Sequence, residues 1–166
     1  MKKVIITTGH ILASRPQTLV RSYIGGKEYT SLHVGVTPLQ QGSSQLKGTD
    51  YEDKEPDTDG QPVAYICTLI EVVSDEKLAM KDVLHLLHEY DMWYRLTADL
   101  LAELAPLYDV EDYETLASYL VGARYTTAEE LACHRKALLG DSTEFDTLNN
   151  FVEQCKNLAR SVFRKK

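Results

Sequence analysis

Apolar residues change their spacing at Ser74 and Asp75, and this change limits the fold more strongly than any other part of the sequence. Before it, residues 62–73 read PVAYICTLIEVV, a nearly unbroken apolar run rich in β-branched and aromatic side chains. Such a run is typical of a buried central strand. After it, apolar residues recur with the period of a helix, roughly 3.6 residues. The sequence therefore predicts an α+β protein in which a sheet precedes a set of helices.

Two further stretches of the first 73 residues have the composition of strands. Residues 2–8, KKVIITT, are rich in β-branched side chains and are followed by Gly9, where we expect the strand to end. Residues 18–38 place two β-prone runs on either side of Gly25 and Gly26, a pair that can adopt the positive φ angles of a tight hairpin turn. We therefore expect a small antiparallel sheet in region 1–73.

The helical region, residues 74–166, predicts about four helices, of which the first is long. On a helical wheel the apolar side chains of residues 75–105 keep one phase, which indicates a single helix. Pro106 is expected to stop it, because proline has no amide donor and clashes with the preceding turn. The helices either form their own bundle or cover one face of the sheet within a single domain, and the sequence leaves both arrangements open.

Each of the other three helices is expected to begin at a capping residue, and two of them to end at a glycine. The expected starts are Asp109 or Asp112, a capping box of Thr127 with Glu130, and the acidic equivalent of that box in residues 141–144, DSTE. The expected ends are Gly122 and Gly140.

Charge is distributed unevenly along the chain, whose formal net charge is −7. Residues 1–49 contain six basic side chains and one acidic one, residues 50–139 contain seven and 20, and residues 140–166 contain five and four. The steepest change falls in the connection 39–62, which is rich in Gln, Ser, Gly, Thr and acidic residues and is long for a compact domain. We expect this acidic loop either to be mobile or to bind a partner.

Part of the acidic loop has the spacing of a calcium-binding loop. Glu55, Asp57, Asp59 and Gly60 match positions 1, 3, 5 and 6 of a twelve-residue EF-hand, in which alternate oxygens converge on the ion. Position 12 requires a bidentate carboxylate but is Ile66, inside an apolar run. The sequence therefore excludes an EF-hand and leaves weak Ca²⁺ binding by the loop as an alternative.

A pair of histidines on the expected long helix is a second candidate for a metal site. His85 and His88 are three residues apart, with Asp82 and Glu89 nearby. On the wheel all four lie opposite the apolar stripe, and HLLHE is not the HExxH order that binds one ion. We interpret them as a solvent-facing polar stripe and predict neither a metal site nor a cofactor.

Residues 7–16, TTGHILASRP, contain the side-chain types of an active site. His10, Ser14 and Arg15 supply a base, a hydroxyl and a phosphate-pairing guanidinium, and His33 in a later strand could approach them. The nucleophile elbow, the P-loop, the dinucleotide fingerprint and the His-x-Thr pairs of two-histidine phosphoesterases are all missing. The second hypothesis is nevertheless an enzyme that uses these residues, a small hydrolase or transferase that acts on a phosphorylated or nucleotide substrate.

Single-stranded nucleic-acid binding by the basic hairpin is the third hypothesis. If Arg21, Tyr23, Lys27 and Tyr29 share one face of the hairpin, bases could stack on that face. The acidic remainder of the chain opposes this role, because its field repels phosphate.

The cysteines and the hydropathy indicate the compartment. Cys67, Cys133 and Cys155 are odd in number and form no CxxC pair, which favours a reducing environment. No apolar run reaches the length of a membrane span or of a signal-peptide core. We expect a cytoplasmic protein that does not bind membranes.

The first hypothesis is a non-enzymatic interaction module, regulatory or inhibitory, that offers an acidic surface to another protein. It requires no motif that the chain lacks, and a long loop with acidic side chains is a common means of recognition. Its expected contacts are Asp53, Glu55, Asp57 and Asp59. The sequence leaves the oligomeric state and the identity of the partner open.

Overall fold

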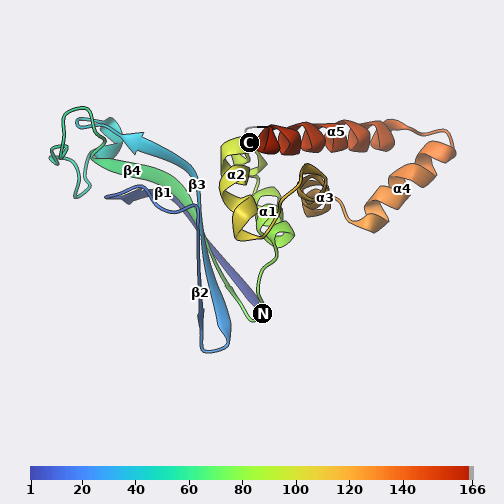
Figure 1. The fold of residues 1–166 in the computed structure, drawn as a ribbon, viewed down its shortest axis with the longest axis horizontal. Coiled ribbons are helices and arrows are strands. Elements are labelled where there is room, and N and C mark those ends of the chain that lie inside the picture. Colours follow the sequence, from blue (N-terminus) through green and yellow to red (C-terminus); the bar gives the residue numbers. More distant parts are fainter. Residues whose placement is uncertain (165–166) are drawn as a thin grey trace. The chain divides into compact units, whose positions relative to one another are not determined.

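The computed structural model describes residues 1–164 and divides into two compact units, Met1–Lys77 and Leu78–Lys166, which we call the sheet unit and the helical unit (Figure 1). The sheet unit contains a four-stranded antiparallel sheet, and the described part of the helical unit contains five α-helices. This confirms the predicted α+β class with the sheet first. Among the described helices, none combines the length and the hydropathy that a membrane span requires.

The four strands are β1 (Lys2–Leu12), β2 (Leu19–Ile24), β3 (Lys27–Leu39) and β4 (Ala64–Ser74), and their order across the sheet is β1-β4-β3-β2. The apolar strand β4 is central, as predicted, with β1 on one side and β3 on the other. Gly25 and Gly26 join β2 to β3 in a hairpin with φ angles of 61° and 78°, which confirms the predicted turn.

Strand β1 does not end at Gly9, where the sequence predicted its end. Thr7 pairs with Leu69 and His10 pairs with Cys67, so β1 accommodates one extra residue opposite β4. Gly9 has a φ of 65°, the left-handed conformation of a glycine bulge. The strand therefore continues to Leu12, because a glycine that adopts this conformation bends a strand without terminating it.

The most deeply buried side chains of the sheet lie on one face. Leu32 and Val34 of β3 and Ile70 and Val72 of β4 are almost fully buried, and the pairing of Leu32 with Ile70 places them on the same side. At one end of this face, Leu39, Leu46, Val63 and Ala64 form a small core that includes part of the acidic loop.

The helices are α1 (Met80–Glu89), α2 (Ala98–Leu107), α3 (Tyr113–Arg124), α4 (Thr127–Leu138) and α5 (Thr143–Phe163), with a short 3₁₀ turn, η2 (Trp93–Arg95), between α1 and α2. Helix α5 packs against α2, α3 and α4, and α1 packs against α3. Buried leucines such as Leu87, Leu104, Leu116 and Leu120 form the core.

The predicted single long helix over residues 75–105 is wrong, because two helices occupy this segment and the first ends just before Asp91. This residue has a φ of 56°, and the amide of Met92 donates to the carbonyl of Leu87 (2.7 Å), which closes α1 with a Schellman motif. Helix α2 then starts at the cap Thr97 and continues through Pro106 to Leu107.

The other helix ends are close to those predicted. Asp112 caps α3 by accepting from the amide of Thr115 (2.7 Å), but Gly122 lies inside α3 and does not close it. The capping box of α4 is Thr126 with Glu129, one residue before the predicted pair. Helix α4 ends just before Gly140, which adopts a φ of 99°, as the sequence predicted.

Candidate functional site

The acidic loop is attached to the sheet by apolar side chains. Leu46 is 1% exposed, and Tyr51 packs against the same small core. The ammonium of Lys54 lies 5.6 Å from the centroid of the Tyr51 ring, and the carboxylate of Glu52 accepts from the amide of Gly48 (3.1 Å). These contacts fix the base of the loop, from which residues 53–60 extend.

The four predicted partner-binding carboxylates, Asp53, Glu55, Asp57 and Asp59, are all exposed. Within residues 1–164 none of them forms an ion pair. Their negative charge is therefore not neutralised by a neighbouring cation of the described chain. No group of three or more His, Cys, Asp or Glu side chains in the described residues is arranged to hold a metal ion.

The structure brings His10 and His33 to the same face of the sheet. His10 pairs with Cys67 and His33 pairs with Leu69, and residues that are two apart on β4 point to the same side. Both histidines are half-buried, and they lie on the two strands that flank β4. The bulge at Gly9 produces this arrangement, because without the extra residue His10 would point to the opposite face.

His33 is oriented by the backbone. Its Nδ1 lies 2.8 Å from the carbonyl oxygen of Gln17 and donates to it, which leaves Nε2 as the acceptor. Burial lowers the pKa of His33, and the nearby His10 lowers it further, while the hydrogen bond to Gln17 and the charge of Glu71 act in the opposite direction. The ring therefore favours the neutral form with its proton on Nδ1.

Ser14 and Arg15, the other two candidate catalytic residues, lie beyond the end of β1 and are exposed. Arg15 lines a cavity of about 290 Å³ together with Pro38 and Tyr65, and neither histidine lines that cavity. Ser14 is not among its lining residues either. The structure thus places the two histidines on one face of the sheet, with β4 between their strands, but does not place Ser14 and Arg15 in one cavity with them.

The polar stripe of α1 faces solvent in part: His85 and Glu89 are exposed, as the wheel predicted, whereas Asp82 and His88 are half-buried. His85 Nδ1 donates to the carbonyl oxygen of Ala123 on α3 (2.6 Å), and the ring of His88 lies edge-on to Trp93 with centroids 6.4 Å apart. Burial lowers the pKa of His88, and the positive charge of Arg124 adds to this effect. Both side chains therefore connect α1 to its neighbours, which a wheel of one isolated helix does not reveal.

The shared face that a stacking platform on the β2–β3 hairpin requires is not present. Arg21 and Tyr23 pair with Thr30 and Glu28, whereas Lys27 and Tyr29 pair with Ile24 and Ser22. Side chains of paired residues point to the same face of the sheet, and successive residues of a strand alternate between faces. Arg21 and Tyr23 therefore point to one face, and Lys27 and Tyr29 point to the other. The four residues do not form one surface for bases.

The helical unit contains a groove that the sequence did not indicate. This groove has a volume of about 910 Å³ and is lined mainly by α3 and α5. Its basic side chains are Lys81, Lys156 and Arg160. Lys156 and Arg160 are four residues apart, a spacing that places both on one face of a helix. That spacing was the one available signal, but it indicates a site only when α3 is known to lie opposite.

No family model, no curated protein and no solved structure matches this chain. The case for a function therefore rests on the geometry of its own residues.

Proposed function

We propose that the chain is a non-enzymatic protein-interaction module whose acidic loop recognises a positively charged surface of a partner protein. The observation that carries this proposal is the presentation of Asp53, Glu55, Asp57 and Asp59, which are exposed on a loop that Leu46 and Tyr51 fasten to the sheet. A cluster of carboxylates on a tethered loop is an effective means of recognising Lys and Arg side chains.

Electrostatics supports a role in partner selection. Four carboxylates within seven residues, 53–59, create a local negative potential that attracts a basic surface over about one Debye length, ~8 Å at physiological ionic strength. Such complementarity raises the association rate and repels acidic competitors. The anchored base of the loop also reduces the conformational entropy that is lost on binding.

The decisive experiment is affinity purification of the tagged full-length chain from its native cells at low salt, followed by mass spectrometry. We expect a stoichiometric basic partner that is recovered with the wild-type chain and lost with Glu55→Gln/Asp57→Asn/Asp59→Asn. The matched control, Glu76→Gln/Glu89→Gln/Glu111→Gln, changes the net charge equally at exposed positions outside the loop and should retain the partner. Recovery of the same partner with the loop variant would refute the role of the loop.

One observation favours a second candidate function, a hydrolase or transferase acting on a phosphorylated or nucleotide substrate. His10 and His33 share a face of the sheet, and the bond from His33 Nδ1 to Gln17 leaves Nε2 available as a general base. In this role Arg15 and Ser14 would contact the substrate from the segment after β1. Hydrolysis of p-nitrophenyl phosphate by the wild type, and at least a hundredfold less by His33→Gln, would support it. Equal rates for the two proteins would refute it.

A further inference from the structure

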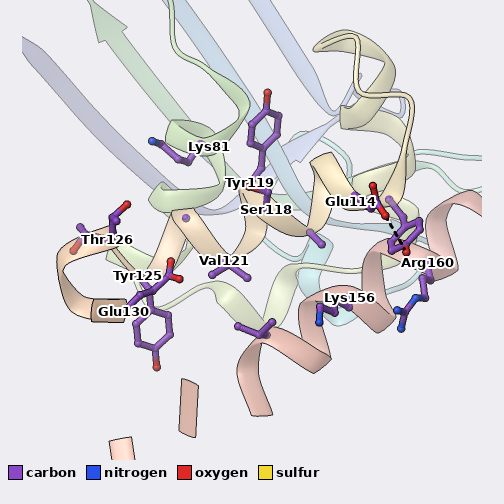
Figure 2. A pocket seen from close by; sticks show the side chains of 15 residues that line it. Lys81, Glu114, Ser118, Tyr119, Val121, Tyr125, Thr126, Glu130, Lys156 and Arg160 are labelled. Carbon is purple, nitrogen blue, oxygen red and sulfur yellow. Dashed lines mark hydrogen bonds between the residues drawn. The ribbon is translucent and has the colours of Figure 1, made fainter. Parts of the chain in front are cut away.

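The groove of the helical unit is lined mainly by α3 and α5, and α1 and the start of α4 border it (Figure 2). Helix α3 contributes one wall and α5 the opposite one, while Lys81 of α1 and the residues around the start of α4 border it. Its volume of about 910 Å³ is at the upper end of the range for small-molecule sites. The groove lies entirely within one compact unit and is independent of the acidic loop.

Part of the lining of the groove consists of small and apolar side chains. Ala117, Val121 and Gly122 come from α3, and Val152 comes from α5. Gly122 has no side chain, and a Cβ added there would lie 3.2 Å from Cδ of Lys81. The aliphatic part of Lys81 therefore lies close to the bare backbone of α3. This apolar part of the lining can contact the hydrocarbon body of a ligand.

Two cations border the groove on the α5 side, as Figure 2 shows for Lys156 and Arg160. The guanidinium of Arg160 lies 5.2 Å from the centroid of the Tyr113 ring, which restricts its orientation. Its only hydrogen-bond acceptor among the described residues is Asn157 Oδ1, at a long 3.4 Å. Since a guanidinium has five N–H donors, Arg160 retains donors for a ligand oxygen.

Lys156 supplies a second positive charge one helical turn away. Its ammonium pairs with Glu153 (2.9 Å), a residue that does not line the groove, and it keeps two further N–H donors. An oxyanion between the two side chains would accept charge-assisted hydrogen bonds from both.

The charges of the groove differ in sign from those of the unit that contains it. Residues 78–166 carry ten basic and 15 acidic side chains, whereas the groove is lined by three basic and two acidic ones. The acidic pair, Glu114 and Glu130, reduces the positive potential, and Glu153 offsets the charge of Lys156, so the remaining positive charge at the groove is small. This balance favours a ligand with one anionic group and disfavours polyanions such as nucleic acid.

We propose that this groove binds a small organic anion, whose carboxylate or phosphate group is held by Lys156 and Arg160 and whose apolar body lies over Val121, Gly122 and Val152. The two cations fix the position of the oxyanion, and the apolar part of the lining favours molecules that carry a hydrocarbon or aromatic body. The site is separate from the proposed protein-binding loop, so either proposal can fail without the other.

The test is an NMR titration of the ¹⁵N-labelled full chain with phenylacetate and with phenyl phosphate, which distinguish a carboxylate from a phosphate source. Inorganic phosphate serves as the probe without an apolar body. We expect saturable shifts of the Gly122 and Val152 amides with at least one of the two aromatic anions. Inorganic phosphate should bind about tenfold more weakly, because it lacks the apolar contacts. Absence of saturable shifts in the groove with both aromatic anions would overturn the proposal.

Two variants assign the binding to the groove. Lys156→Gln/Arg160→Gln should weaken the preferred anion about tenfold or more, because it removes both charge-assisted contacts. The matched control, Arg135→Gln/Arg164→Gln, makes the same charge change at exposed positions outside the groove and should bind like the wild type. Unchanged affinity in the first variant would contradict the site.

Gly122→Leu keeps Lys156 and Arg160 and adds a large side chain to the lining of the groove beside Lys81, so it provides a test if the double variant does not fold. Leucine is a good helix former, and Gly122 lies inside α3. We expect it to abolish the shifts at Val152, with a dispersed spectrum that shows an intact fold. Wild-type affinity in Gly122→Leu would overturn the placement of the ligand body.

Discussion

The acidic loop and the groove are both charged surfaces, but their side chains are held in different ways. In the loop, only the base is fixed, by Leu46 and Tyr51, and the carboxylates extend into solvent. In the groove, Arg160 is stacked on Tyr113 and Lys156 is paired with Glu153. Recognition by the loop should therefore depend on long-range charge, and recognition by the groove on shape and direct contact.

The largest expected effect comes from Leu46→Ala, which removes the anchor of the loop without altering any charge. Because Leu46 is 1% exposed, truncation should cost about 2–5 kcal/mol in the stability of the sheet unit. Denaturant unfolding measures this cost, and hydrogen exchange of residues 40–62 locates it. Leu138→Ala is the control, since Leu138 is 87% exposed and its truncation should change stability by less than about 0.5 kcal/mol. A small effect at Leu46 would mean that the loop is not anchored as described.

The second largest expected effect is a difference in how binding by the acidic loop and binding by the groove depend on ionic strength. Raising it from about 0.05 M to about 0.5 M shortens the Debye length and should weaken partner binding by the loop about tenfold, or ~1.4 kcal/mol. Binding of phenylacetate in the groove should weaken less, because its apolar contacts are insensitive to screening. Both affinities can be followed by calorimetry. Equal salt dependence of the two would contradict the contrast between them.

A pair of glycine substitutions compares the backbones of the two units. Gly9 has a φ of 65° with no atom within 4 Å of an added Cβ, so Gly9→Ala should cost about 1 kcal/mol through backbone strain alone. Gly122→Ala should be neutral or slightly stabilising, because helix propensity favours alanine by ~1 kcal/mol and the flexible stem of Lys81 can move aside. Unfolding midpoints in urea measure both changes. A stabilising Gly9→Ala would argue against the bulge.

The smallest expected effect is a dependence of stability on pH. The pKa of His33 is lowered from its ordinary value of 6.5 by burial and by His10, so the unfolded chain takes up a proton before the folded one. Stability should therefore fall as the pH decreases below about 6.5, and His33→Gln should reduce this fall. Urea unfolding at about pH 7.5 and about pH 5.5 tests it. The pKa of His88 in the helical unit is also lowered, so His88→Gln serves as the comparison. An unchanged pH dependence in both variants would contradict the expectation.

Much of the fold was predictable, because it follows from local rules. The apolar run that became β4, the turn at Gly25 and Gly26, and the cap at Asp112 depend on residue types within a few positions of each other. The break at Asp91 was missed, because a left-handed aspartate is allowed at many positions and is stabilised here by the Schellman bonds that follow it.

The candidate sites were predictable only in part. Exposure of the acidic loop followed from its composition. The placement of His10 and His33 on the same face did not, because it depends on one extra residue at Gly9, and a shift of one residue moves a strand side chain to the other face. The alternation of side chains along a strand also excludes a shared stacking surface on the hairpin. Its four candidate residues have suitable side chains but point to opposite faces: Arg21, Tyr23, Lys27 and Tyr29.

The sequence by itself determined the α+β class, the order of sheet and helices, the central position of β4 and the acidic character of the loop, since periodicity and composition are local properties of the chain. Only the tertiary structure decided which side chains share a face and which helices enclose the groove. Strand register and helix packing depend on contacts between residues far apart in sequence, and such contacts leave no periodic signal in the segments that make them.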